Sequence, residues 1–173
     1  SVKELIALAK SKPGQLNYAS AGIGSSIHLA MEVFQRAAGI RIEHIPYKGA
    51  ALALNDVVGG QVTIMFAAIS TVVDHVRTGR LRPLGISSTK RRAILPDVPT
   101  IAESGLPGFE LNSWQGVVAP AQTPAEVIGK LNAEINAILD LPEMKQHFAK
   151  LGPDAAGGTP KDLADRIDAA CPL

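Results

Sequence analysis

One stretch constrains the fold more than any other: a strand-like run, a turn of small residues, and the start of a helical pattern. It extends from Asn17 to Ala30. Gly22 and Gly24 let the backbone take positive φ and approach a ligand closely. A helix that begins at Ser25 or Ser26 directs unpaired N–H groups and the positive end of its dipole toward that turn. The pattern therefore predicts a strand–turn–helix unit that can bind an anion at the turn.

Two familiar glycine motifs are excluded by the residues that follow. A dinucleotide fingerprint requires a third glycine where Ile27 stands, and a P-loop requires a lysine after Gly24, where none occurs. A plainer interpretation remains open. The serine hydroxyl could simply accept hydrogen bonds from its own helix, with the glycines only turning the chain.

Composition removes several classes of function. The 173 residues are 46% hydrophobic with a formal net charge of +1, which fits one domain or slightly more and no nucleic-acid partner. The single cysteine, Cys171, excludes an internal disulfide and a cysteine-based metal cage. The four histidines lack close metal-ligand spacing, so we expect neither a metal nor a cofactor. No apolar run approaches the roughly eighteen residues of a membrane-spanning helix, so direct membrane insertion is not expected.

Helical and strand-like patterns alternate over the first half of the chain. Ser1 and Glu4 form a capping-box pattern at the start of the first helix. Further helices are expected over 26–38, 50–58 and 70–77, and strands over 16–20, 40–45, 62–66 and 81–87. Such alternation predicts an α/β fold with a mainly parallel sheet flanked by helices.

The pattern changes after Ser88. Prolines dominate 90–108, where we expect a loop with one short helix near 100–104, and 109–119 is predicted to be extended. Helices are then expected over 124–139, 142–151 and 160–169.

Several motifs together resemble one known family. These are Ala19–Ser25 with His28–Leu29, Pro46–Gly49, Gly60–Val62, Gly79–Arg82, Leu95–Gly105, Trp114–Gly116 and Ala119–Pro124. In this order they resemble the Bug or TctC-like proteins, the periplasmic solute-binding components of tripartite tricarboxylate transporters. The resemblance extends from the first residue to about Lys161, and the set is much more specific than any one motif.

The resemblance implies a periplasmic-binding-protein type II-like fold that closes on a small carboxylate. It further implies that 1–110 form the second-lobe α/β ligand-binding domain. On this basis 111–173 are the crossover and the C-terminal helical return into the first lobe, whose N-terminal part has no counterpart here. We therefore expect a fragment or a truncated relative.

The resemblance also implies the site residues. One ligand carboxylate would be held by backbone N–H groups and hydroxyls of Ser20, Ala21, Gly22, Gly24, Ser25 and Ser26. Tyr47, Lys48 and Gly49 would form a neighbouring loop at the cleft edge. No catalytic residue is implied.

By the same resemblance, the chain is expected to bind a mono-, di- or tricarboxylic acid or an amino acid and to deliver it to the permease subunits of a membrane transporter. Its expected location is the periplasm, with a signal peptide that is removed or lies outside this sequence. An alternative is a sensor that presents its bound ligand to a signalling partner, since both functions need the same cleft.

A less favoured alternative is a serine hydrolase. Ser25 or Ser26 would be the nucleophile, His28 the base and Glu32 the group that orients it, because these residues could share a helix face. The order Gly-Ile-Gly-Ser-Ser differs from the Gly-x-Ser-x-Gly elbow of many hydrolases.

Overall fold

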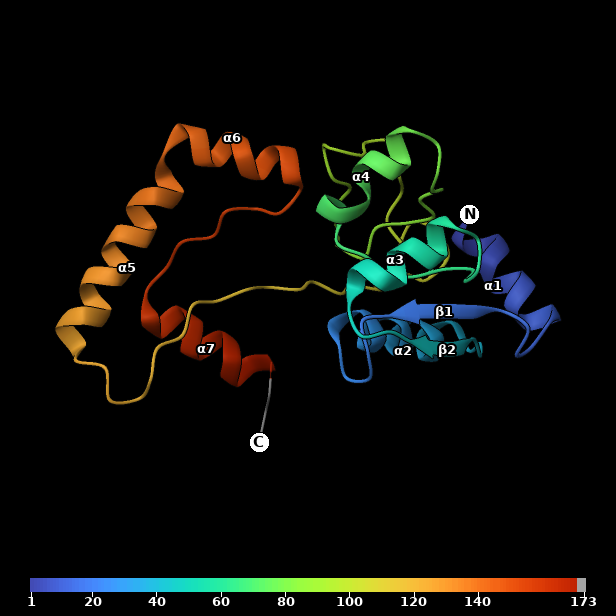
Figure 1. Ribbon diagram of the computed structural model, residues 1–173, viewed down its shortest axis with the longest axis horizontal. Coiled ribbons are helices and arrows are strands. Elements are labelled where there is room, and N and C mark those ends of the chain that lie inside the picture. Colours follow the sequence, from blue (N-terminus) through green and yellow to red (C-terminus); the bar gives the residue numbers. More distant parts are fainter. Residues whose placement is uncertain (171–173) are drawn as a thin grey trace. The chain divides into compact units, whose positions relative to one another are not determined.

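The chain divides into two compact units, with the boundary between Ser113 and Trp114 along the sequence (Figure 1). The computed structural model describes residues 1–170, with the side chain of residue 170 left out. Unit 1 comprises residues 1–113, and unit 2 comprises the described residues from Trp114 onward. The expectation for Cys171 lies outside the described residues.

Unit 1 alternates helices and short strands in the predicted order as far as the helix that ends at Val58, and the next helix follows without a strand between them. Its elements are α1 (Val2–Ser11), β1 (Asn17–Ser20), α2 (Ser26–Ala38), β2 (Glu43–Pro46), α3 (Ala50–Val58) and α4 (Ile69–Arg77). The predicted capping box is present, with the Glu4 N–H donating to Ser1 Oγ at 3.3 Å. Gly39 ends α2 with φ of 61°, a left-handed conformation that favours glycine.

The sheet is parallel, as the alternation predicts. β1 and β2 pair in the register Asn17↔Glu43 to Ser20↔Pro46, and the two strands lie side by side in Figure 1. A parallel bridge also joins Tyr18 to Ile64, and the Ala19 N–H donates to the Ile64 carbonyl at 2.9 Å. β1 is therefore the central strand, with β2 and the Ile64 segment as its neighbours.

The predicted strands at 62–66 and 81–87 were wrong in extent. Each makes only a single bridge, Tyr18↔Ile64 and Ile86↔Thr100. The Asn17 Oδ1 accepts the Thr63 N–H at 2.8 Å and so replaces a backbone partner in the first segment. Pro83 lacks the N–H that a ladder in the second segment would need. The short helix predicted near 100–104 is a series of turns.

The core of unit 1 lies between β1, α1 and α2. Tyr18, Met31 and Phe34 are buried in it, and Phe34 meets Phe66 and Phe109 edge-on with ring centroids 6.0 and 6.1 Å apart. This aromatic contact fixes α2 against the sheet and with it the position where α2 begins.

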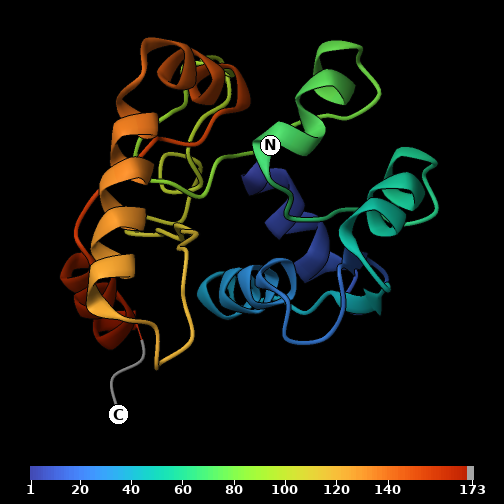
Figure 2. The ribbon, with the colours of Figure 1, turned by 60° about the vertical axis from the view of Figure 1, so that its left-hand side comes forward.

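Unit 2 contains the predicted helices with small shifts of their ends. They are α5 (Ala125–Asp140), α6 (Pro142–Leu151) and α7 (Pro160–Ala170), and Figures 1 and 2 both show α6 leaving α5 at a steep turn. Asn136 holds the segment before α7 because its Oδ1 accepts the Gly158 N–H at 2.8 Å. Along α5 and α6, both described throughout, no side chain is fully buried. Over the described chain, none of the helices has the length and apolar character needed to cross a bilayer.

The end of α2 gives a local test of the fold. We expect Gly39→Ala to destabilise α2 by about 1 kcal/mol, because a Cβ is strained at positive φ although the space around it is open. Hydrogen exchange of the α2 amides measures this loss. Gly129→Ala is the matched control, since Gly129 lies inside α5 with nothing within 4 Å of an added Cβ. This change should stabilise α5 by about 0.5–1 kcal/mol and so slow the hydrogen exchange of its amides. Equal effects of the two changes would contradict the cap assignment.

Candidate functional site

The candidate site lies where three parallel segments end and three helices begin. β1 leads into α2, β2 leads into α3, and the segment after Ile64 leads into α4. Because Ser20 pairs with Pro46 and Tyr18 with Ile64 in parallel, these ends share one edge of the sheet. In open α/β sheets this carboxyl edge is the usual place for a ligand.

Two of the three helix N-termini have no side-chain cap. The N-cap residues Gly49 of α3 and Ala68 of α4 donate or accept no side-chain cap hydrogen bond. By contrast, Ser25 caps α2, since its Oγ accepts the His28 N–H at 3.3 Å. The Thr71 N–H bonds to the Ala68 carbonyl at 3.0 Å, and the other first-turn N–H groups of α3 and α4 make no hydrogen bond to a residue that the structure describes. They are open donors at the positive ends of two helix dipoles.

The turn between β1 and α2 is held by its own hydrogen bonds. Ser20 is fully buried, and its Oγ accepts the Gly22 N–H at 3.1 Å. Ser25 Oγ donates to the Gly22 carbonyl at 2.7 Å. Gly22 has φ of 123°, and a Cβ there would lie 3.3 Å from the Tyr47 carbonyl oxygen. Glycine is required at Gly22 because the two loops approach each other closely.

These contacts sort the N–H groups of the turn into two classes. Those of Gly22, Gly24 and Ser25 have partners within the turn, namely Ser20 Oγ, His28 Nδ1 and the Gly22 carbonyl. Those of Ala21 and Ser26 make no hydrogen bond to any residue that the structure describes. The glycines thus shape the turn, and the N–H groups of Ala21 and Ser26 are free to meet a ligand.

The predicted residues of the second loop differ from one another in what they contribute to the site. The Tyr47 hydroxyl donates to Asp56 Oδ2 at 2.6 Å, which raises the pKa of that hydroxyl. Its ring packs against the cluster of Ala19, Ala53 and Val62. Lys48 is exposed, and it is the only charged residue in 20–26, 46–50 and 65–69. The site edge is therefore nearly neutral, with fixed dipoles as its main attraction for an anion.

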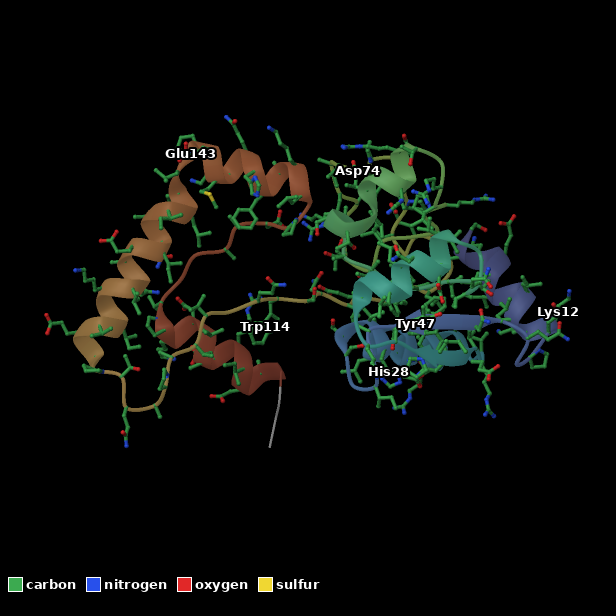
Figure 3. All side chains as sticks on the ribbon, viewed as in Figure 1. Lys12, His28, Tyr47, Asp74, Trp114 and Glu143 are labelled. Atoms are coloured by element: carbon green, nitrogen blue, oxygen red, sulfur yellow. The ribbon has the colours of Figure 1, made fainter. Side chains whose placement is uncertain are left out.

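Figure 3 shows His28 and Tyr47 in the part of unit 1 that contains the two strands. The hydrolase arrangement is not formed there. Ser25 Oγ donates to a backbone carbonyl, and His28 Nδ1 already accepts the Gly24 N–H at 3.2 Å. Glu32 lies 4.0 Å from His28 Nε2, but its Oε1 also accepts the Tyr18 hydroxyl at 2.7 Å. The Ser25 proton and the His28 Nδ1 acceptor are thus both engaged with the backbone, so Ser25 and His28 do not form a nucleophile–base pair.

Sequence reasoning missed a polar cluster beside the turn. Tyr18, His44 and Glu32 join Ser20 and His28 there, with Ser20 Oγ only 2.6 Å from His44 Nε2. In the strand predicted over 40–45, His44 alternates with Ile40 and Ile42, and a histidine in line with two apolar residues is the signal that the sequence offers. The described residues hold no group of three or more potential metal ligands.

Two hollows in unit 1 lie away from this edge. The larger, about 550 Å³, is lined by Pro13, Gly14 and residues 41–44, next to the starts of β1 and β2. The smaller, about 390 Å³, is lined by α2 and residues 106–110. Neither is lined by a residue of the three loops at 20–26, 46–50 and 65–69. The candidate site is therefore identified by its backbone N–H donors and not by a cavity.

Comparison with known proteins gives consistent results. A family profile described as the tripartite tricarboxylate transporter family receptor, TctC, matches residues 1–170. A protein from the tcbD-tcbE intergenic region of Pseudomonas sp. strain P51 is 42% identical over 165 residues, which are 95% of this chain and 49% of that protein. The chain spans about half the length of such curated relatives.

Two solved structures extend the likeness to the fold. R. palustris Rpa4515 with adipate is 35% identical with a TM-score of 0.93, over 98% of this chain and 56% of that one. MatC from Rhodopseudomonas palustris with bound malate is 31% identical with a TM-score of 0.89, over 96% of this chain and 58% of that one. The α/β fold is that of part of a periplasmic binding protein, and the chain belongs to the TctC family of solute-binding receptors.

Proposed function

We propose that this chain is the part of a periplasmic solute-binding protein that holds a carboxylate of a small organic acid. The observation that carries this proposal is the shared edge at which α2, α3 and α4 begin, with uncapped N-termini on α3 and α4 and no acidic side chain in the three loops. N–H groups at helix N-termini bind carboxylates through hydrogen bonds and the helix dipole together.

The proposed ligand contacts follow from the predicted set and the geometry. We propose that Ala21 and Ser26 offer free N–H groups, while Ser20, Gly22, Gly24 and Ser25 shape the turn that presents them. Gly49 begins α3, and Lys48 beside it provides one positive charge. Tyr47 would contribute through its backbone, because its hydroxyl is bonded to Asp56.

Dicarboxylic acids are the ligand class that the comparisons favour. One structural neighbour contains adipate and another contains malate. These acids differ in length and in polarity, which suits an edge that recognises the carboxylate group by backbone donors and leaves the rest of the ligand unspecified. Delivery to the permease subunits of a tripartite tricarboxylate transporter, and location in the periplasm, are proposed from membership of the family.

The arrangement of the chain within a whole receptor is also a proposal. We propose that 1–110 form one ligand-binding lobe and that 111–173 form the crossover and the helical return to the other lobe. The division of the chain into compact units near Ser113 supports this, as does coverage of about half of each relative.

The glycine turn gives the sharpest test of the site. Calorimetric titration with adipate and malate should give saturable binding to the chain, and Gly22→Ala should weaken it by more than about tenfold. A Cβ at φ of 123° is strained and crowds the Tyr47 carbonyl oxygen, so the turn must change shape. Gly14→Ala is the control, because it carries similar strain at φ of 73° before β1. The site assignment fails if both variants bind as the unaltered chain does, or if both lose binding equally.

Substitution of Ser25, the N-cap residue of α2, distinguishes a binding function from a catalytic one. We expect Ser25→Ala to weaken binding about threefold to tenfold, through the loss of roughly 1 kcal/mol of cap stabilisation. Ser11→Ala should leave affinity unchanged, since the Ser11 hydroxyl bonds only to the Leu8 carbonyl at the end of α1. Titration calorimetry measures both variants. Ester hydrolysis by the chain that disappears in Ser25→Ala would instead support the hydrolase alternative.

A further inference from the structure

Two histidine rings lie stacked beside the glycine turn. His28 comes from α2 and His44 from β2, and their ring centroids are 4.4 Å apart at an interplanar angle of 29°. The Tyr18 ring from β1 stacks on His44 at 4.7 Å. Three rings from three elements thus form one stack next to the loop that carries the candidate ligand contacts.

Each histidine is linked by hydrogen bonds to the N–H group of one glycine, either directly or through Ser20. His28 acts directly, because its Nδ1 accepts the Gly24 N–H at 3.2 Å. His44 acts through Ser20, whose Oγ lies 2.6 Å from His44 Nε2 and accepts the Gly22 N–H at 3.1 Å. The two positive-φ residues of the turn are therefore both fixed by the histidine pair.

We propose that His28 and His44 are positioning residues of the carboxylate site: they hold the turn from Gly22 to Gly24 in its ligand-ready shape while both rings are neutral, and protonation of His28 releases Gly24. Ligand affinity then falls as the pH falls through the titration of the pair. This inference rests on the proposed function, because it concerns the same site. It adds a role for two residues that touch the turn and not the ligand.

Protonation changes the hydrogen bonds in a defined way. A protonated His28 carries a proton on Nδ1, so two donors, Nδ1–H and the Gly24 N–H, face each other and their hydrogen bond is lost. A neutral His44 with a bare Nε2 accepts the Ser20 hydroxyl proton. Once Nε2 is protonated it donates to Ser20 Oγ, and the hydroxyl proton must turn to the Gly22 carbonyl, 3.2 Å away. The Gly24 contact is thus lost, whereas Ser20 Oγ still accepts the Gly22 N–H and only the direction of its own hydroxyl proton changes.

The surroundings of the pair fix the sign of the effect. The titratable groups that face it are Glu32 on α2, 4.0 Å from His28 Nε2, and Tyr18 on β1. Burial and the charge of His28 lower the pKa of His44, and Glu32 opposes this shift. Burial and the hydrogen bond to Glu32 raise the pKa of Tyr18, so its hydroxyl stays neutral. The lowered pKa of His44 favours its neutral ring, and the positioning effect is lost once the rings are protonated.

A competing effect has the opposite sign. An imidazolium near the turn would attract a carboxylate and strengthen binding at low pH. Glu32 lies against His28 and offsets much of that added charge, whereas nothing in the described turn replaces the lost acceptor of the Gly24 N–H. We therefore expect the loss of geometry to dominate.

The inference is tested first without a ligand. In the ¹⁵N-labelled chain, the amide signals of Gly24 and Gly22 should both move when the pH is lowered from 8 to 5. His28→Asn places an acceptor oxygen near the position of Nδ1 and should keep Gly24 protected from hydrogen exchange at both pH values. His28→Leu should remove the protection. The proposal would be overturned if the amide shifts of Gly22 and Gly24 did not change with pH and the hydrogen exchange of Gly24 did not change in His28→Leu.

Affinity for adipate is then measured by calorimetry at pH 8 and pH 5.5. The unaltered chain should bind adipate about threefold to tenfold more weakly at pH 5.5 than at pH 8, because about one hydrogen bond is lost. His28→Asn combined with His44→Gln should remove most of this dependence, and His28→Leu should bind weakly at both pH values. His75→Asn, on α4, is the matched control and should retain the full dependence. Protonation of adipate is common to all variants, so the comparison between them isolates the protein.

The outcomes separate the two proposals. If adipate and malate bind at neither pH, the proposed function fails and the glycine amides still decide the inference. If they bind with the same pH dependence in the double variant as in the unaltered chain, or more tightly at pH 5.5, the proposed function stands and the positioning role is wrong.

Discussion

The parallel pairing of β1 with its two neighbours is the constraint on which the site depends. Ser20 lies opposite Pro46, and Tyr18 lies opposite Ile64, so the loops that follow all leave from one edge. A parallel strand must be followed by a crossover, and here α2 and α3 supply it. Their N-termini therefore begin at the same edge, where Lys48 is the one charged residue of the three loops. The site is a consequence of topology more than of special residues.

The sequence carried most of this information in local form. The capping box at Ser1, the glycine end of α2 at Gly39 and the bounds of α2, α3 and α6 followed from caps, breakers and periodicity. The strand lengths did not, because a ladder depends on partners far along the chain. Asn17 Oδ1 takes the Thr63 N–H that a backbone carbonyl would otherwise accept, and no local pattern near 62–66 reveals that exchange.

The candidate site was predictable as a loop but not as a network. Glycines and serines between a strand and a helix indicate an anion site, yet they do not tell which N–H groups remain free. That depends on Ser20, His28 and His44, which are separate in sequence and meet only through the parallel register. His28 had a local signal in its spacing of three residues from Ser25, the spacing of a capping box. His44 had only its place on an apolar strand face.

The central claim is that free backbone N–H groups at this shared edge bind a carboxylate. Amide chemical-shift mapping of the ¹⁵N-labelled chain with adipate tests it most directly. The account predicts saturable shifts that are largest at the N–H groups of Ala21 and Ser26 and in the first turn of α3. Saturable shifts centred instead on the hollow around Gly14 and Arg41 at the strand starts, or the absence of saturable shifts, would contradict it.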